Sequence, residues 1–247
     1  MNKKIISIIP AKSISRGLPG KNIKPLDGHP LLAYSIAASV QSKYIQRTIC
    51  STESREVADI AANYGAEIPF LRPVELTNDL TTDLEVFAHL LQWLKEKEEY
   101  TPDIIVQLRP TTPFRKAGWI DECIDLLLNN PNADSVRTVC EAPIHPYKMW
   151  KIENTNPFLI PLLKLEGVEE PYNMPRQILP KCYWQTATID VLWQKTISQK
   201  NSMTGKNILP YFISPELAVD IDNIIDFKLA EVMIRENDLT KDVVRPK

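Results

Sequence analysis

The sequence predicts an α/β fold with a largely parallel sheet, and three observations support this. Over about the first 140 residues, short apolar runs alternate with helical patterns of about ten to fifteen residues, which is typical of right-handed βαβ units. The first run, residues 5–9, is apolar almost throughout, as expected of a strand covered on both faces. After residue 140, closely spaced prolines end the alternation and indicate an excursion from the sheet.

Each expected element has a local reason. Helices are expected where apolar residues recur at intervals of three or four, at 31–40 after Pro30, 54–65, 84–99, 117–130 and 224–235. Ser54 is the expected N-cap of the second helix, and Gly65 its end. Strands are expected where short apolar runs lie between turns, at 5–9, 48–51, 66–70, 103–108 and 134–139. Regular structure resumes at 184–193 and 208–213, and residues 72–82 form a long polar loop.

Length and composition suit one domain over residues 1–247, since 44% apolar residues can supply its core. The formal net charge of −2 gives no general attraction to nucleic acid or to an anionic membrane, so neither is an expected partner. Four cysteines without a Cys-x-x-Cys pair predict neither a zinc site nor a disulfide framework. The apolar run near residue 5 is too short for a secretion signal, so we expect a cytoplasmic protein.

The excursion is expected over residues 141–180, as short strands and a lid or subunit-contact arm. Seven prolines interrupt this segment, at positions 143, 146, 157, 161, 171, 175 and 180. Its apolar residues, Phe158, Leu159 and Ile160 among them, would be exposed if nothing covered them. We therefore expect the arm to cross the interface of a homodimer.

The first strand opens into a basic loop that suits an oxygen-rich anion such as a triphosphate. Lys12, Arg16 and Lys21 fall within about ten residues of one another, and Gly17 and Gly20 allow the backbone to approach a ligand closely. The alternative interpretation is a solvated connection that is basic by coincidence.

Two aspartates are a candidate metal site. Ligands of open α/β sheets bind at the carboxyl ends of the strands, where the loops 12–22 and 109–115 and the segment 219–222 are expected to meet. In an extended segment, Asp220 and Asp222 would share one face, which suits Mg²⁺ bridging a triphosphate. The alternative is that Asp222 caps the helix that follows it.

Several segments together carry a family resemblance. They are Ile9-Pro10-Ala11-Lys12, residues 16–23, Ser51-Thr52-Glu53, residues 71–76, residues 109–115, Pro175-Arg176-Gln177 and Val219-Asp220-Ile221-Asp222. In order and spacing, over nearly the whole chain, they resemble the motifs of the acylneuraminate cytidylyltransferases. The resemblance implies a Rossmann-like three-layer sandwich with a protruding dimerisation arm. It also implies transfer of CMP from CTP to the anomeric hydroxyl of a nonulosonic, sialic-acid-like or related 2-keto sugar acid, with release of pyrophosphate.

The resemblance also implies roles for individual residues. The nucleotide-binding residues would be Ala11, Lys12, Ser15, Arg16, Lys21, Asn22, Thr81 and Thr82. The acceptor-binding residues would be Arg109, Thr111, Lys148, Arg176, Gln185 and Thr186, and Asp220 and Asp222 would bind Mg²⁺ or Mn²⁺. Lys21 and Arg16 would stabilise charge at the transition state, and Asp220 is the candidate proton acceptor. Because the acceptor's own hydroxyl is the nucleophile, no Ser, Cys or His triad is required.

Three departures from the family pattern bear on the substrate. Sialic acid enzymes usually have arginine where this chain has Lys12, glutamine where it has Arg109, and an Asn-Gly pair near Thr186-Ala187. The latter two regions line the acceptor pocket in the family, so a changed pocket predicts a changed acceptor. Legionaminic acid, pseudaminic acid or another keto acid are the open choices.

Two other functions stay open. A GT-A-type glycosyltransferase would share the sheet and an Asp-x-Asp motif, although the place of that motif at residue 220 favours nucleotidyl transfer. A non-catalytic nucleotide-binding paralogue would keep the fold without turnover. Only a turnover measurement separates it from an enzyme.

Overall fold

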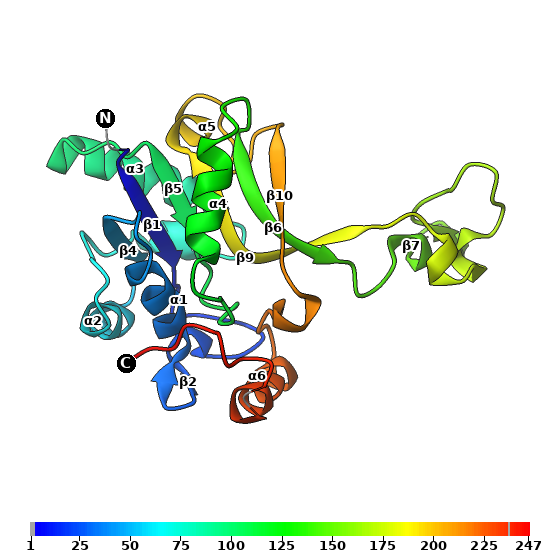
Figure 1. Ribbon diagram of the computed structural model, residues 1–247, viewed down its shortest axis with the longest axis horizontal. Helices are drawn as coiled ribbons and strands as arrows, with labels where there is room; N and C mark the ends of the chain where they lie inside the picture. The colour runs from blue at the N-terminus through cyan, green and yellow to red at the C-terminus, as the bar shows by residue number, and fades with distance from the viewer. Residues whose placement is uncertain (1–2, 237) are drawn as a thin grey trace.

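A six-stranded sheet runs through the body of the protein in the computed structural model, which describes residues 3–236 and 238–247 (Figure 1). The strand order is β10-β6-β9-β5-β1-β4, with bounds Ile208–Phe212, Ser135–Glu141, Tyr183–Trp193, Ile104–Gln107, Ile5–Pro10 and Arg47–Ser51. β1 pairs in parallel with β4 and β5, and β10 pairs in parallel with β6. Only β9, among these six strands, is antiparallel to its neighbours. The mainly parallel sheet is confirmed.

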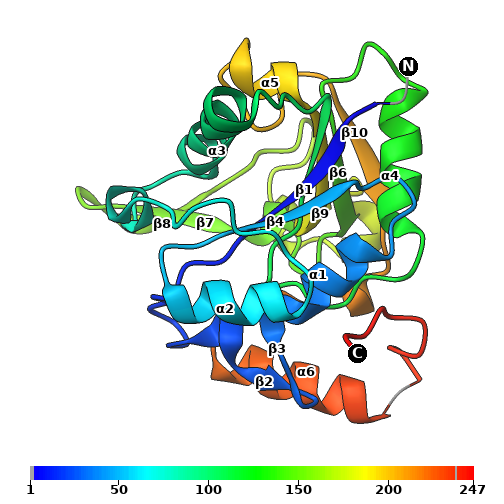
Figure 2. The same ribbon diagram turned by 90° about the vertical axis from the view of Figure 1, so that its left-hand side faces the viewer.

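Helices cover both faces of the sheet (Figure 2). On one face, α1 (Leu31–Val40), α2 (Arg55–Asn63) and α4 (Trp119–Leu128) pack against the strands through one apolar cluster. On the other face, α3 (Asp83–Glu98) and α5 (Gln194–Ser198) pack through a second cluster. The three-layer sandwich is therefore confirmed.

A third apolar cluster lies beyond the carboxyl ends of β1 and β5. It joins α6 (Ile224–Glu236) to the small hairpin of β2 (Pro25–Leu26) and β3 (His29–Pro30). Ile221, three residues before the start of α6, is fully buried in this cluster. Burying this residue seats the segment 219–222 at the carboxyl ends of the strands, where the first loop also lies.

Most expected elements are confirmed within one or two residues, including Ser54, whose hydroxyl accepts a hydrogen bond from the amide of Val57. The expected strand at 66–70 is wrong. Of this stretch, only Glu67 forms a bridge, with Ile49, at the edge beyond β4. Pro69 has no amide hydrogen to donate, so the pairing cannot continue.

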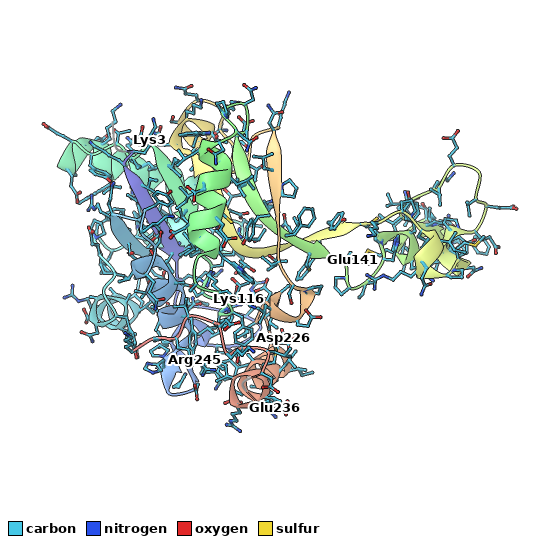
Figure 3. All side chains as sticks on the ribbon, viewed as in Figure 1. Lys3, Lys116, Glu141, Asp226, Glu236 and Arg245 are labelled. Atoms are coloured by element: carbon cyan, nitrogen blue, oxygen red, sulfur yellow. The ribbon has the colours of Figure 1, made fainter. Side chains whose placement is uncertain are left out.

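Over the segment where the sequence predicts an excursion, an arm leaves the body after Glu141 and returns at Tyr183 (Figure 3). It contains the antiparallel pair β7 (Trp150–Glu153) and β8 (Asn156–Pro161), and short 3₁₀ turns at Pro146–Lys148, Pro171–Asn173 and Arg176–Ile178. Ile152 and Phe158 are 77% and 74% exposed. Further 3₁₀ turns lie in the body at Lys21–Ile23, Val74–Thr77 and Pro215–Leu217. Throughout the described residues, no helix has the length and apolar character needed to cross a membrane.

Asp134 ties the start of β6 to the start of β10. Its carboxylate accepts hydrogen bonds from Lys200 Nζ at 2.5 Å and from the backbone amides of Lys206 and Asn207 at 2.9 and 3.2 Å. The hydrogen bond from Lys200 is the main reason why the pKa of Asp134 is lowered to about 2.

We predict that Asp134→Ala lowers the free energy of unfolding at pH 7 by about 1–3 kcal/mol, because Lys200 and two part-buried backbone amides lose their acceptor. A lowered pKa stabilises the fold above the ordinary carboxyl pKa, about 4, and this contribution is lost as the pH falls toward 2. Urea unfolding should therefore show a smaller difference in the free energy of unfolding between wild type and Asp134→Ala at pH 3 than at pH 7. Asp59→Asn, an exposed change on α2, is the control. The assignment is contradicted if wild type and Asp134→Ala have the same free energy of unfolding at pH 7, or if their difference is no smaller at pH 3.

Candidate active site

An open cleft of about 270 Å³ lies at the carboxyl ends of β1 and β5. One wall is the loop 11–22, called the basic loop below, and the opposite wall is residues 72–82, called the strap. The start of α3 and the loop 109–115 complete the lining. Six residues singled out from the sequence line this cleft together, namely Lys12, Lys21, Asn22, Thr81, Arg109 and Thr111.

Polar atoms without a partner mark the same region. Among the described residues, four buried side-chain atoms lack a hydrogen-bond partner: Asn22 Oδ1, Arg72 Nε, Asp220 Oδ1 and, elsewhere, Tyr100 Oη. Asn22 and Arg72 line the cleft, and Asp220 lies in the adjoining segment 219–222, called the aspartate loop below. Buried polar atoms are normally satisfied in folded proteins, so this concentration indicates a site for a polar ligand.

Each cation of the basic loop contacts a carboxylate. Lys12 Nζ lies 3.5 Å from Asp79 Oδ1, and Arg16 forms an ion pair with the other oxygen of Asp79. Lys21 Nζ donates to Asp222 Oδ1 and to the carbonyl of Ile221, both at 2.9 Å. Lys12 and Lys21 line the cleft, and each cation of the basic loop is held by a carboxylate from the strap or from the segment 219–222.

Glu53 anchors the basic loop to the strap. Its Oε1 accepts hydrogen bonds from the amide and hydroxyl of Ser13 at 2.8 and 2.6 Å, and its Oε2 accepts one from Arg72 at 3.1 Å. Burial raises the pKa of Glu53, but the hydrogen bonds outweigh this and the pKa is lowered. Sequence reasoning did not assign Arg72 to the site, although it stands in one of the quoted motifs.

The aspartate loop and the basic loop are in direct contact. A Cβ atom on Gly17 would lie 2.2 Å from the carbonyl oxygen of Asp222, so no larger residue fits without movement of the backbone. The amide of Ile221 donates to the carbonyl of Thr111 at 2.8 Å, which joins the aspartate loop to the loop 109–115. Three loops that are distant in sequence are thus held around one space.

The suggestion that Asp222 caps the following helix is wrong. Asn223 takes that position, because its Oδ1 accepts hydrogen bonds from the amides of Ile225 and Asp226 at 2.8 and 3.1 Å. In return, Asp226 Oδ2 accepts from the amides of Asp222 and Asn223. The carboxylate of Asp222 is left 73% exposed and is free of any capping role.

The two aspartates fit a divalent cation that shares its coordination with a ligand. Burial is the main cause of the raised pKa of Asp220, the Thr111 hydroxyl opposes this shift, and the nearby Asp222 adds to it. A cation would satisfy the unpartnered Asp220 Oδ1 and offset the repulsion between the two carboxylates. Within the described residues, no group of three or more His, Cys, Asp or Glu side chains is arranged to hold a metal. Phosphate or water oxygens would have to supply the other ligands.

On the floor of the cleft, Arg109 belongs to a network of ion pairs. It donates to Asp83 at 2.5 Å and to Asp190 at 3.4 Å, and Asp190 also accepts from Arg137 at 2.7 Å. The guanidinium of Arg109 is therefore already paired with carboxylates. Asp83, which also lines the cleft, was not singled out from the sequence.

Arg115 lies beneath this network and is fully buried. Its guanidinium donates to the carbonyls of Arg109 and Thr188 at 2.7 and 2.8 Å, and to Ser35 Oγ and Thr112 Oγ1 at 2.9 and 3.0 Å. Burial lowers its pKa to about 9, so the group stays charged at neutral pH. These bonds hold the loop 109–115 in place.

Other candidate residues lie elsewhere. Ala11 and Thr186 are fully buried, the amide of Ala11 donating to the carbonyl of Ser51 at 2.9 Å and the Thr186 hydroxyl contacting that of Thr138 at 2.9 Å. Thr82 caps α3 in a reciprocal arrangement with Glu85. Lys148 and Arg176 lie on the arm, Gln185 contacts Arg137, and Ser15 is half-buried in the basic loop. The roles of all these residues in binding remain predictions.

This α/β fold, with a basic loop facing paired carboxylates at the strand ends, defines a nucleotidyltransferase. Residues 6–157 match the model of the cytidylyltransferase family, and the chain belongs to that family.

Known proteins resemble the chain along nearly all of its length. It is 29% identical to the CMP-N,N'-diacetyllegionaminic acid synthase of Legionella pneumophila, over 95% of this chain and 97% of that one. It is 30% identical to the N-acylneuraminate cytidylyltransferase of Escherichia coli, over 93% of this chain and 52% of that longer one. In fold, it is similar to a CMP:2-keto-3-deoxy-manno-octonic acid synthetase complexed with CTP, with a TM-score of 0.67 at 14% identity, covering 94% and 99% of the two chains.

Proposed function

We propose that this protein transfers CMP from CTP to the anomeric hydroxyl of a nonulosonic acid and releases pyrophosphate. One observation carries the proposal: the cations of the basic loop and the carboxylates of the aspartate loop meet at one cleft, as Lys21 and Asp222 do at 2.9 Å. The named relatives act on acids of this class. A CTP-dependent step would place the reaction in the cytoplasm.

The chemistry needs charge stabilisation more than a nucleophile from the protein. The anomeric hydroxyl oxygen attacks the α-phosphorus of CTP, the bond from that phosphorus to the bridging oxygen breaks, and pyrophosphate leaves. Lys21 and Arg16 would stabilise the negative charge on the phosphates, with Lys12 beside them. Asp220 would take the proton of the hydroxyl, since its Oδ1 is buried and unpartnered, whereas the Asp222 carboxylate is exposed and paired with Lys21.

Asp220 and Asp222 would hold Mg²⁺ or Mn²⁺ together with the nucleotide phosphates. When bound, the cation supplies charge neutralisation at the phosphates. The protein contributes the placing of the two carboxylates, through the buried Ile221 between them and the hydrogen bond from its amide to Thr111.

The acceptor would differ from N-acetylneuraminic acid. Arg109 is neutralised by Asp83 and Asp190, so this end of the cleft offers a paired network and no free guanidinium. Such a network suits hydroxyl and amide groups, which can bond to both its donors and its acceptors. The full-length similarity to a diacetyllegionaminic acid synthase supports an acid of that type as the first candidate.

The arm would cross to a second copy of the chain. Its exposed apolar residues, including Ile152 and Phe158, need a partner surface. Lys148 and Arg176 stand on this arm, so a homodimer would bring them toward the partner's cleft and its acceptor. The membership of the cytidylyltransferase family decides against a GT-A-type glycosyltransferase.

The first prediction is that pyrophosphate is released with CTP, Mg²⁺ and one acid from a panel of N-acetylneuraminic, legionaminic, pseudaminic and simpler 2-keto sugar acids. GTP, UTP and ATP should give no more than background. A coupled phosphate assay measures the release, and mass spectrometry identifies the CMP-sugar. Binding of CTP without turnover on any acid would instead indicate a non-catalytic paralogue.

The second prediction is that Asp222→Asn lowers kcat/KM by about 100-fold or more, because the cation loses a charged ligand. The thermal midpoint should stay within about 2 °C of wild type, since the side chain is exposed and caps no helix. Asp59→Asn on α2 is the matched change outside the cleft. Near-normal turnover of Asp222→Asn over a Mg²⁺ titration refutes the metal assignment.

The third prediction is that the protein sediments as a dimer at micromolar concentration. The double variant Ile152→Glu/Phe158→Glu should sediment as a monomer, because charges on the arm oppose burial at an interface. Val40→Glu, at an exposed apolar position on α1, should remain dimeric. A monomeric wild-type protein removes the hypothesis.

A further inference from the structure

Asp79, on the strap, contacts two cations of the opposite wall of the cleft. Its Oδ1 lies 3.5 Å from Lys12 Nζ, and its Oδ2 pairs with the guanidinium of Arg16. Each oxygen of one carboxylate thus engages a different cation of the basic loop. A phosphate group presents the same chemistry, since it also offers several anionic oxygens to Lys and Arg donors.

We propose that Asp79 competes with substrate and product phosphates for Lys12 and Arg16, and thereby weakens retention of the pyrophosphate product. This inference rests on the proposed cytidylyl transfer. In the ligand-free protein the Asp79 carboxylate is paired with Lys12 and Arg16, and these contacts must break when a triphosphate binds to the same cations. The same contacts re-form as pyrophosphate leaves.

The charges of the basic loop support this role. Asp79 contacts both Lys12 and Arg16, and Asp222 contacts Lys21, so each of the three cations has a carboxylate partner and two carboxylates offset two of the three positive charges. An incoming polyphosphate therefore gains these cations only by displacing carboxylates. Removing one carboxylate should strengthen phosphate binding, whereas removing a cation should weaken it.

The contacts of Asp79 are of the kind that a ligand can displace. The side chains of Asp79 and Arg16 are 43% and 82% exposed, and exposed ion pairs are weak. The pair of Glu53 and Arg72 at the same cleft is buried and is reinforced by Ser13, so it suits permanent anchoring. The two pairs differ in burial and therefore in function.

The shape of the strap does not depend on the Asp79 carboxylate. The neighbouring Asn78 holds the turn, because its Oδ1 accepts from the amide of Leu80 and its Nδ2 donates to the carbonyl of Glu75, both at 2.9 Å. Over the described residues, the Asp79 carboxylate contacts only Lys12 and Arg16. A variant at this position should therefore change the charge of the cleft without unfolding the strap.

The test compares Asp79→Asn with wild type by titration calorimetry of pyrophosphate in the presence of Mg²⁺, at low and at 0.5 M salt. We expect Asp79→Asn to bind pyrophosphate about three- to tenfold more tightly at low salt, with a smaller difference at high salt because screening weakens exposed charges. Asp79→Glu, which keeps the charge, should stay close to wild type. Asp59→Asn, with the same loss of charge on α2, should show no change.

Equal or weaker binding by Asp79→Asn overturns the inference, as does an equal gain in Asp59→Asn, which would indicate a general effect of net charge. Asp79→Ser provides a second variant, and circular dichroism verifies that both are folded. The proposed function fails separately, if wild type shows no CTP-dependent pyrophosphate release. If pyrophosphate binds neither to wild type nor to Asp79→Asn, this inference fails, whereas the turnover assay alone decides the proposed function.

Discussion

The buried guanidinium of Arg115 is the interaction on which the arrangement of the cleft depends. No carboxylate neutralises it among its described partners, and a buried cation is costly unless hydrogen bonds surround it. Carbonyl and hydroxyl oxygens from the loop 109–115, β9 and α1 supply those bonds. The loop cannot move without leaving a buried charge unsatisfied. Through Thr111 and Ile221, the same constraint reaches the aspartate loop.

Two kinds of charge therefore coexist in this site. Arg115 and Glu53 are each held by several hydrogen bonds, and Arg72 is buried against Glu53, so these groups act as scaffold. Arg16 and Asp79 are exposed and held by one another. A site that binds a highly charged substrate and releases a charged product needs both kinds, because only exposed pairs exchange partners readily.

Much of the fold could be predicted from the sequence, because local chemistry sets many boundaries. Pro30 begins α1 and Ser54 caps α2 as expected. The strand expected at 66–70 failed because an apolar pattern does not reveal whether a neighbouring strand can pair across a proline. The basic loop and the paired aspartates were visible as short motifs. Asp79 and Asp83 were not, since their roles depend on how the strap and the start of α3 are placed beside the basic loop and Arg109, which no local pattern encodes.

The contact between Gly17 and the carbonyl of Asp222 restricts which positions of the site can accept substitutions. The distance between the basic loop and the aspartate loop is set by a contact between their backbones, so no side-chain substitution at this contact can adjust it. Arg109 and its carboxylate partners, at the proposed acceptor end, are under no such restriction. A lineage could therefore diversify the sugar that it activates while inheriting the geometry of the phosphorus chemistry unchanged.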